Sequence, residues 1–508
     1  MLMPTVDLVA VVTTSASAVE VRKIPGIVGW LQIRSDLIGD IPANWLRSHF
    51  PGRLLYTLRT DLAGGRFDRS HEERQRRLIE AAGSGYDLVE LEAASDLGPE
   101  LLAAIPPAKR MIVWRGPAGP VGQLESEFRR LSEFPARYYC MALSATHTSD
   151  GVRPLSLLQS LKRTDLVAFC EGPSGLWSQL LSPSFGAPLL FGKLDDWARK
   201  NGELSIQQLI TDYGFPAIRS LEKLYGMVGT RIFQSPSPRL HNAAYSALDH
   251  PALFLPFHSE NFEDFWCGVV QSAVLDDLGI PIEGLVIVSP YKEVAVPVAD
   301  SRSASVSKAG SSNVFARRNN RWKAETTDPE SIAAIRDLCP VKAAVIGCGG
   351  AGRAIAGALQ QTGSEVTLVN RGLQRGEYAM HLLGLPFVPL SEFRAKGFDV
   401  IVNATPVGKD NDGFPFIIDS LEEQTLIIDL AYGLRPTPLV SAVLARGGTA
   451  IDGYDVLLVQ VRKQFHLMTG LEMPDGISRE TALGNIAYMP RTAFRVAHGS
   501  ADAYEYSA

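Results

Sequence analysis

The chain has 508 residues, a formal net charge of −6, and 46% hydrophobic residues. One hydrophobic core rarely serves such a length, so we expect roughly two to four domains. Lysine and arginine are spread along the chain without forming a basic patch, which argues against a nucleic-acid-binding protein. The five cysteines are scattered and lack metal-ligand spacing. This usage predicts a reducing compartment, no disulfide framework and no metal site.

The first residues, MLMPTVDLVAVVTTSASA, mimic a signal peptide in their small residues, but no positive charge precedes the apolar part and Asp7 lies within it. A buried first strand explains this run better. No apolar run reaches the ~18 residues that a bilayer-spanning helix needs. We therefore expect a soluble, cytoplasmic protein, a monomer or homodimer, that acts on a small molecule and has neither a membrane nor nucleic acid as partner.

Residues 1–218 predict an α/β fold of the (β/α)₈, TIM-like barrel type. Eight short apolar, β-rich runs alternate there with polar, helix-compatible stretches. Continuous apolar runs are typical of parallel strands buried on both faces, and eight strand–helix alternations in this length favour a barrel. Polar residues at the ends of these runs should face the barrel mouth: Arg34, Arg59, Glu90, Glu92 and Arg115.

Two further domains and a tail are expected. Residues 222–325 contain the runs YGMVGT, ALFLPF and GLVIVSP and predict a small α/β domain, with a loop or weak hairpin over 301–328. Residues 326–470 predict a Rossmann domain, whose last helix, 455–468, should pack on the middle domain. Residues 471–508 form a tail without an informative pattern.

The run IGCGGAGRAIAGAL, residues 346–359, predicts a phosphate-binding turn between a strand and a helix. Gly347 permits the tight turn, Gly349 and Gly350 let the backbone approach a pyrophosphate, and Gly352 lets helix pack closely on strand. The helix start adds free N–H groups and a positive dipole end. The alternative is an ordinary strand-to-helix turn, but the following strand, EVTLVNRG, has the spacing of a βαβ unit.

The end of that following strand favours NADP over NAD. NAD-preferring sites carry an acid there for the ribose hydroxyl, whereas this strand ends in Asn370 and Arg371, with Arg375 nearby. These residue types suit the additional phosphate of NADP.

Ordered motifs over roughly the last 285 residues resemble the shikimate dehydrogenase family: GTRIFQSPSPRLHN, GLVIVSPYKE, KAGSSNVF, ETTDP, IVNATPVG, DLAYGLRPTPL and GYDVLLVQVRKQF. The resemblance implies NADP-dependent interconversion of 3-dehydroshikimate and shikimate, in the chorismate pathway to aromatic amino acids. It implies that Lys292 and Asp328 are catalytic and that Ser235, Ser237, Asn313, Tyr432 and Gln460 bind substrate. Together with the glycine turn it implies NADP contacts from Gly347, Gly349, Gly350, Ala351, Gly352, Asn370, Arg371, Arg375, Thr405 and Gly453.

The chemistry suits these residue types. Hydride exchange at a ring carbon that bears a hydroxyl requires a proton to leave or reach that oxygen, so a titratable group must lie within reach. Taken singly, Lys292 reads as a solvated lysine, Asp328 as a helix cap and Tyr432 as a packing residue. Because they occur together, in the order of the family's motifs and beside an NADP-binding turn, these residues favour a catalytic role.

Val288 stands where the family usually has a threonine. Shikimate is therefore the favoured substrate, while quinate or a related ring acid stays an alternative.

The barrel resembles the type I 3-dehydroquinate dehydratase family, which occurs fused ahead of shikimate dehydrogenase, through LQIRSDLIGD, LYTLRTDLAGGRF and YDLVELEA. That family forms an imine between a lysine and the substrate ketone, with a histidine as proton shuttle. The family's lysine, histidine, two glutamates and arginine appear here as Cys140, Arg115, Gln32, Ala63 and Gln179, and WARKNGELS replaces its final loop.

These departures predict a barrel that keeps the fold and has lost dehydratase activity. The five lysines before residue 210, Lys23, Lys109, Lys162, Lys193 and Lys200, are expected at element edges or in helices. Two alternatives stay open: a bifunctional dehydratase and dehydrogenase, and a non-catalytic regulator that binds NADP or a ring acid.

Overall fold

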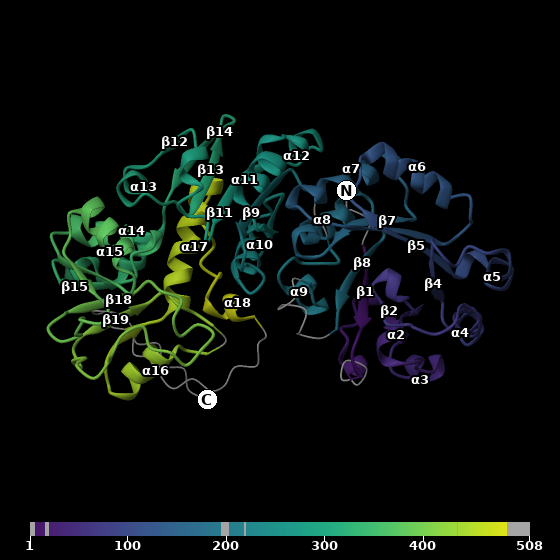
Figure 1. The fold of residues 1–508 in the computed structure, drawn as a ribbon, viewed down its shortest axis with the longest axis horizontal. Helices are drawn as coiled ribbons and strands as arrows, with labels where there is room; N and C mark the ends of the chain where they lie inside the picture. The colour runs from purple at the N-terminus through teal and green to yellow at the C-terminus, as the bar shows by residue number, and fades with distance from the viewer. Residues whose placement is uncertain (1–5, 16–19, 195–202, 218–219, 434, 485–508) are drawn as a thin grey trace. The chain divides into compact units, whose positions relative to one another are not determined.

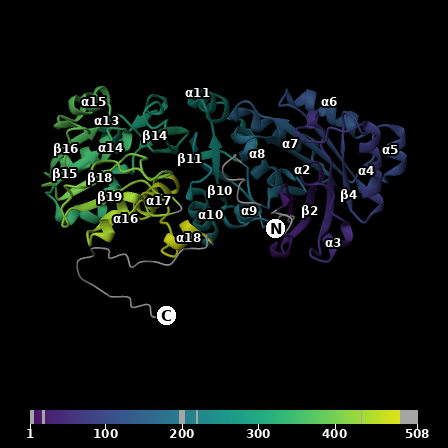
Figure 2. The ribbon, with the colours of Figure 1, turned by 60° about the horizontal axis from the view of Figure 1, so that its bottom comes forward.

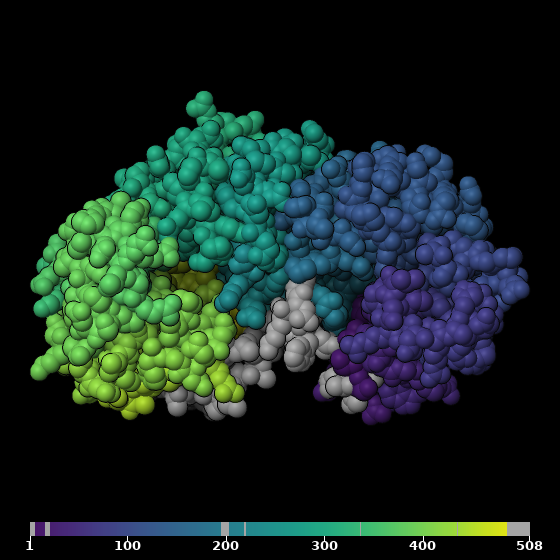
Figure 3. Space-filling model, in the orientation of Figure 1, coloured from purple at the N-terminus to yellow at the C-terminus, as the bar shows by residue number. Residues whose placement is uncertain are grey.

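The computed structural model describes residues 6–15, 20–194, 203–217, 220–433 and 435–484. The chain divides into two compact units, Met1–Glu283 and Gly284–Ala508 (Figure 1). Figure 3 shows one face of the molecule in space-filling form, coloured by residue number as in Figure 1. Within the described residues, no helix is both long and apolar enough to cross a membrane.

The first unit begins with a parallel sheet of eight strands among the described residues. They are β1 (Asp7–Val12), β2 (Val28–Arg34), β3 (Arg53–Thr57), β4 (Leu88–Glu92), β5 (Arg110–Pro117), β6 (Tyr138–Ser144), β7 (Leu166–Glu171) and β8 (Leu189–Lys193). Their order is β7-β6-β5-β4-β3-β2-β1-β8, and the rings of Phe169 on β7 and Phe191 on β8 are 6.2 Å apart. The predicted barrel is confirmed, in a nearly closed form.

Helices follow the barrel strands and lie outside them (Figure 2). They are α2 (Ser35–Ile38), α3 (Ala43–Arg47), α4 (His71–Gly83), α5 (Pro99–Ala104), α6 (Val121–Leu131), α7 (Val152–Leu161), α8 (Leu176–Leu181) and α9 (Ile206–Thr211). Helix α4 shows why the sequence folds this way. The side chain of Ser70 caps its start by accepting from the Glu73 N–H, and Leu78 and Ala81 supply the buried face.

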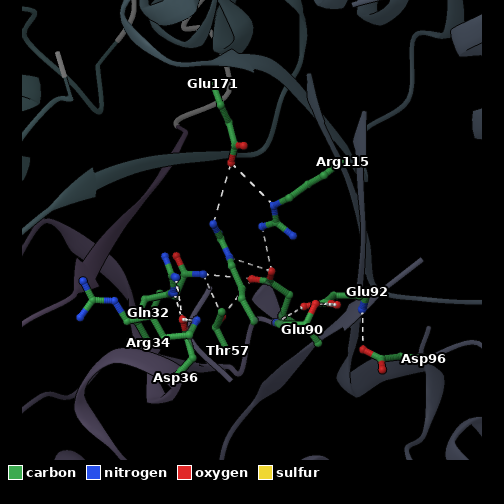
Figure 4. Close-up of polar contacts among 12 residues, drawn as sticks. Gln32, Arg34, Asp36, Thr57, Glu90, Glu92, Asp96, Arg115 and Glu171 are labelled. Carbon is green, nitrogen blue, oxygen red and sulfur yellow. Dashed lines mark hydrogen bonds and ion pairs between the residues drawn. The ribbon is translucent and has the colours of Figure 1, made fainter. Parts of the chain in front are cut away.

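A buried polar layer ties the strands β2 to β5 together around Glu90 (Figure 4). One carboxylate oxygen, Oε2, accepts from Gln32 at 3.1 Å and from Thr57 at 2.9 Å. The other, Oε1, accepts from Arg59 at 3.2 Å and from Arg115 at 2.9 Å. The Glu90 side chain is 3% exposed, so this layer holds a charge that water does not solvate.

The charges around Glu90 decide its ionisation. Burial raises the pKa of this carboxyl, but the charges of Arg59, Arg115 and Arg34 outweigh burial and lower it to about 2. Four of the five residues expected at the barrel mouth therefore act together. The fifth, Glu92, behaves differently: it accepts from the Thr60 hydroxyl at 2.8 Å and pairs with Arg74 of α4 at 3.3 Å.

The first unit continues with β9 (Lys223–Gly229) and β10 (Ala252–His258), which pair in parallel, and with α10 (Ser237–Ala247), α11 (Phe262–Phe265) and α12 (Val274–Asp277). The division between the units falls within β11 (Ile282–Ile287). The second unit then holds β12 (Ser301–Arg302), α13 (Ala304–Ala309), β13 (Val314–Arg318) and β14 (Arg321–Glu325). The segment expected as a loop or weak hairpin thus contains a β13–β14 hairpin, whose turn places Asn319 and Asn320 at φ 51° and 59°.

A second parallel sheet forms the rest of the second unit. Its strands are β15 (Lys342–Ile346), β16 (Glu365–Asn370), β17 (Phe387–Pro389), β18 (Val400–Asn403), β19 (Leu426–Asp429) and β20 (Ala450–Ile451). The order β17-β16-β15-β18-β19-β20 is the doubly wound Rossmann order, as predicted. The helices are α14 (Gly350–Gln361), α15 (Leu373–Leu383), α16 (Pro438–Ala445), α17 (Gly453–Thr469) and α18 (Arg479–Leu483).

Alternate residues of β15 are buried on opposite faces of this sheet. Ala343 and Val345 belong to a core that includes Leu359 of α14, whereas Ala344 and Ile346 belong to one that contains residues of α16. Figure 2 shows α14 and α15 on one side of the strands and α16 on the other. The long helix α17 lies beside β13, as expected, and the Arg318 guanidinium donates to the carbonyl of Met468 at 3.0 Å (Figure 1).

The Glu90 layer yields a stability prediction. The pKa of Glu90 in the folded state lies below its ordinary value near 4.5, so its contribution is complete above that pH and is lost as the pH falls towards about 2. We expect Glu90→Gln, which leaves the largely buried guanidinium groups of Arg59 and Arg115 with the more distant carboxylate of Glu171, at 3.9 and 3.7 Å, to lower the unfolding free energy at neutral pH by about 3–5 kcal/mol.

Urea unfolding across pH measures both effects. The acid-side slope of the wild type should flatten in Glu90→Gln and persist in Glu80→Gln, which removes an exposed carboxylate of α4. An unfolding free energy of Glu90→Gln equal to that of the wild type would contradict this account.

Candidate active site

The two residues predicted to be catalytic meet in the second unit. Lys292 lies in the turn after β11, and Asp328 begins the 3₁₀ helix Asp328–Leu338. The Lys292 Nζ lies 3.0 Å from Oδ1 and 2.9 Å from Oδ2 of Asp328. The aspartate side chain is 2% exposed and the lysine side chain 20% exposed. The carboxylate is therefore enclosed, while its ammonium partner still reaches solvent.

Two predicted substrate-binding residues contact the same carboxylate. The Asn313 Nδ2 donates to the Asp328 Oδ1 at 3.2 Å and to the Thr327 hydroxyl at 3.0 Å. The Gln460 Nε2, from α17, lies 3.3 Å from that Oδ1 and 2.9 Å from the Ser331 hydroxyl. Three predicted residues from separate parts of the chain thus converge on the carboxylate of a fourth.

This arrangement can hold and move a proton. Three donors aimed at one carboxylate fix its orientation, and the fixed carboxylate positions the ammonium of Lys292. An ammonium held in this way can exchange a proton with an oxygen within hydrogen-bond reach. The amides of Asn313 and Gln460 can each donate to and accept from neighbouring hydroxyls.

Sequence reasoning missed part of this cluster. The Gln464 Nε2 lies 3.3 Å from the Thr327 hydroxyl, and Ser331 is a partner of Gln460. The available sign was the spacing of four residues between Gln460 and Gln464, which places both on one face of α17. Nothing in the sequence marked Ser331, because a serine one turn into a helix is unremarkable.

The two serines predicted to bind the substrate carboxylate lie in the first unit. The Ser235 hydroxyl donates to the Ser237 hydroxyl at 3.1 Å and accepts from the Ser237 N–H at 3.3 Å. On the same helix, α10, His241 is fully buried, and its ring stacks on Phe254 with the ring centroids 4.2 Å apart. Burial lowers the pKa of His241 to about 3, so this ring is neutral and serves packing.

Tyr432 lines a small cavity in the second unit that is partly open to solvent. Its ring lies 5.3 Å from the ring of Tyr454, and the Lys409 Nζ lies 5.1 Å above it. Gly453, a predicted cofactor residue, lines the same cavity, and a Cβ there would lie 2.4 Å from the carbonyl oxygen of Ala431. The backbone at this position therefore requires glycine.

The glycines of the turn after β15 are accommodated for different structural reasons at each position. Gly347 has φ +103°, a conformation that favours glycine, and a Cβ on Gly352 would lie 1.8 Å from the Gly347 carbonyl oxygen. A Cβ on Gly350 would lie 2.7 Å from the Cβ of Ser311, so this glycine allows packing on a neighbouring loop. Gly349, the N-cap of α14, has open space where its Cβ would be.

The end of β16 and the loop after β18 surround this turn. The Asn370 Oδ1 accepts from the Cys348 N–H at 3.1 Å, and a Cβ on Gly347 would meet the methyl group of Thr405 at 2.8 Å. Arg371 is exposed, and so is Arg375, whose Nη2 lies 2.5 Å from the Glu293 Oε1. Open backbone at a helix start with two exposed guanidinium groups nearby fits a dinucleotide that carries an additional phosphate.

Four of the residues expected in place of the dehydratase family's catalytic residues, Cys140, Arg115, Gln32 and Gln179, are buried or engaged in structural contacts. Burial raises the pKa of Cys140 to about 12, so this thiol stays protonated and inert. The Gln179 Nε2 donates to the Phe191 carbonyl at 2.8 Å, and Gln32 and Arg115 belong to the Glu90 layer. Most of WARKNGELS, residues 197–205, lies outside the described residues.

The described lysines among the first 210 residues lie at the ends of helices and strands. Lys23 and Lys109 end short 3₁₀ helices, Lys162 caps α7, and Lys200 lies outside the described residues. Among the described residues, Lys193 at the end of β8 is the lysine on a barrel strand, and it pairs with Glu203. A Cβ on the preceding Gly192 would lie 2.8 Å from a methyl carbon of Leu209 in α9, so the Lys193 side chain leaves β8 on the face opposite to that contact.

Comparisons with known proteins match both halves of the chain. A family model of the type I 3-dehydroquinase matches residues 29–219, and one of the shikimate dehydrogenase substrate binding domain matches residues 227–315. The chain is 26% identical over 488 residues to the chloroplastic bifunctional 3-dehydroquinate dehydratase/shikimate dehydrogenase of Arabidopsis thaliana, an alignment covering 87% of this chain and 79% of that protein.

The second half also matches single-function relatives. Shikimate dehydrogenase (NADP(+)) of Methanothrix thermoacetophila is 31% identical over 259 residues, which covers 50% of this chain and 93% of that protein. A solved structure of dehydroquinate dehydratase and shikimate dehydrogenase from S. pombe covers 95% of this chain and 98% of its own, at 18% identity and a TM-score of 0.42. The chain therefore belongs to the shikimate dehydrogenase family through its second half and carries a type I 3-dehydroquinase domain ahead of it.

Proposed function

We propose that the chain is an NADP-dependent shikimate dehydrogenase that interconverts 3-dehydroshikimate and shikimate. The convergence of Lys292, Asn313 and Gln460 on the enclosed carboxylate of Asp328 carries this proposal. We further propose a barrel over 1–218, a substrate-binding domain over 222–325 and a nucleotide-binding domain over 326–470. The two family matches, over 29–219 and 227–315, support the first two ranges.

In this proposal each residue has a physical task. Lys292 gives a proton to, or takes it from, the ring oxygen at the reacting carbon, and Asp328 keeps its ammonium in position. Asn313 and Gln460 bind ring hydroxyls, and the hydroxyls of Ser235 and Ser237 bind the ring carboxylate. Tyr432 completes the substrate site.

The proposed cofactor site lies around the glycine turn. Bound NADP supplies the hydride acceptor or donor at its nicotinamide ring. The backbone of the turn and the start of α14 hold the pyrophosphate, and Asn370, Arg371 and Arg375 select the 2′-phosphate. Thr405 and Gly453 serve the nicotinamide side. The NADP(+)-dependent relatives in other organisms support this choice of cofactor.

We propose shikimate as the ring acid, with quinate as the alternative. Val288, half-buried at the end of β11, offers a methyl group where the family usually has a hydroxyl. Loss of one neutral hydrogen bond weakens ring binding by about 1 kcal/mol without removing the other contacts.

For the barrel we propose a retained fold without imine chemistry. Cys140 is not an amine, and Arg115 is engaged with Glu90. A second candidate, a bifunctional enzyme, is favoured by the alignment of nearly the whole chain with a bifunctional relative. It is also favoured by the amine of Lys193 on β8.

Removal of the proposed proton donor tests the dehydrogenase. Lys292→Ala should lower kcat for shikimate oxidation at least about 100-fold, because general acid–base catalysis contributes on that scale. NADPH absorbance follows the reaction with purified protein, shikimate and NADP⁺. Lys323→Ala, an exposed lysine of β14 paired with Glu325, is the control and should keep wild-type turnover. Robust turnover by Lys292→Ala would remove Lys292 from the mechanism.

Two alanine variants separate the structural glycine from the cofactor-binding one. Gly352→Ala places a Cβ 1.8 Å from a carbonyl oxygen and should destabilise the second unit by about 1–3 kcal/mol or more. Gly349→Ala meets open space, so it should unfold like the wild type yet bind NADP⁺ more weakly. Thermal unfolding and nucleotide titration measure the two effects. Wild-type NADP⁺ affinity in Gly349→Ala would argue against pyrophosphate binding at this turn.

Borohydride trapping decides between the two candidates for the barrel. Reduction of an imine between 3-dehydroquinate and an amine leaves a stable covalent adduct that mass spectrometry detects. We expect no adduct on residues 1–218. An adduct on Lys193, absent from Lys193→Met and present in Lys109→Met, would establish the bifunctional alternative.

A further inference from the structure

A fully buried arginine joins three segments of the second unit. Arg353, in the first turn of α14, donates from Nε to the Ala309 carbonyl at 2.8 Å and from Nη1 to the Cys348 carbonyl at 3.1 Å. The same Nη1 lies 3.4 Å from the Oε1 of Glu293. Its side chain is 1% exposed. Arg353 therefore ties α13, the glycine turn and the segment after β11 together.

Glu293 links this buried arginine to an exposed one. Its Oε1 lies 3.4 Å from the Arg353 Nη1 and 2.5 Å from the Arg375 Nη2. The Arg375 side chain is 56% exposed. Both guanidinium charges also act on Cys348, because they oppose the effect of burial, which raises the pKa of this thiol to about 11. The two arginines thus flank the glycine turn and share one carboxylate oxygen.

The carboxylate follows Lys292 directly in the chain, and the same turn packs against the glycine turn. The Lys292 carbonyl accepts from the Ser312 N–H at 2.7 Å, and a Cβ on Gly350 would lie 3.5 Å from the Lys292 Cβ. A change in the contacts of the Glu293 side chain therefore shifts the backbone turn that positions the Lys292 ammonium.

We propose that Glu293 couples recognition of the 2′-phosphate to the position of Lys292: it pairs with Arg375 in the free protein and yields that arginine to the phosphate when the nucleotide binds. This inference rests on the proposed NADP site. Because one carboxylate and one phosphate compete for the same guanidinium group, the ion pair lowers the affinity for the phosphate. Once released from Arg375, Glu293 keeps its contact with the buried Arg353, which positions the Lys292 turn.

The proposal predicts opposite effects of one substitution on binding and on turnover. Glu293→Gln removes the competitor, so it should bind adenosine 2′,5′-bisphosphate and NADP⁺ about two- to fivefold more tightly, the scale of an exposed ion pair. Its affinity for NAD⁺, which lacks the phosphate, should not change. The kcat for shikimate should fall, because the turn loses its charged contact with Arg353. Purely structural damage would instead lower the affinity for both NADP⁺ and NAD⁺.

Isothermal titration calorimetry with adenosine 2′,5′-bisphosphate, NADP⁺ and NAD⁺ measures the predicted changes in affinity independently of turnover. Glu365→Gln is the matched control: it makes the same charge change in the exposed Lys342 pair at the start of β16, the strand end opposite Asn370. Its affinities and kcat should equal those of the wild type.

A double-mutant cycle makes the test specific. In an Arg375→Ala background the gain from Glu293→Gln should vanish, because the competition requires that guanidinium group. A gain that persists there, or no gain in the single variant, overturns the proposal. If the wild type binds NADP⁺ and NAD⁺ equally, the proposed cofactor choice itself fails. If the wild type prefers NADP⁺ through Arg375 but ignores Glu293, only the coupling fails.

Discussion

One enclosed carboxylate organises the second unit. Asp328 accepts hydrogen bonds from the Lys292 ammonium in the turn after β11, from the amide of Asn313 directly before β13, and from the amide of Gln460 on α17. A buried carboxylate without donors would cost several kcal/mol, so these segments are stable only in the arrangement that satisfies it. The same requirement leaves the Lys292 ammonium held in place but still reachable. Stability and chemistry therefore depend on one contact set.

The barrel also contains a buried carboxylate that several donors hold, but the donors are of another kind. Glu90 also accepts hydrogen bonds from neighbouring segments, but its charged donors are two guanidinium groups that cannot lose their protons. Such a layer holds the strands that supply it in place. The contrast between Lys292 beside Asp328 and Arg115 beside Glu90 separates a pair able to exchange a proton from a pair suited to holding a fold.

Much of the fold and part of the site followed from the sequence. Continuous apolar runs predicted β1 to β8, because burial on both faces favours apolar residues at most positions, and the glycine spacing predicted the turn from β15 to α14. Contacts between charged side chains that are distant in sequence and that no motif links could not be predicted. Glu293 and Arg375 are separated by 82 positions, and Glu92 pairs with Arg74 on a helix, since the fold alone brings these charges together.

The central claim is that Lys292 exchanges a proton with the reacting oxygen of the ring acid. A crystal structure of the full chain with shikimate and NADP⁺ tests it most directly through one distance, from the Lys292 Nζ to the nearest ring hydroxyl oxygen. The account predicts about 2.6–3.2 Å, with the Asp328 contact retained. A ring bound with that ammonium turned away from every hydroxyl would contradict it.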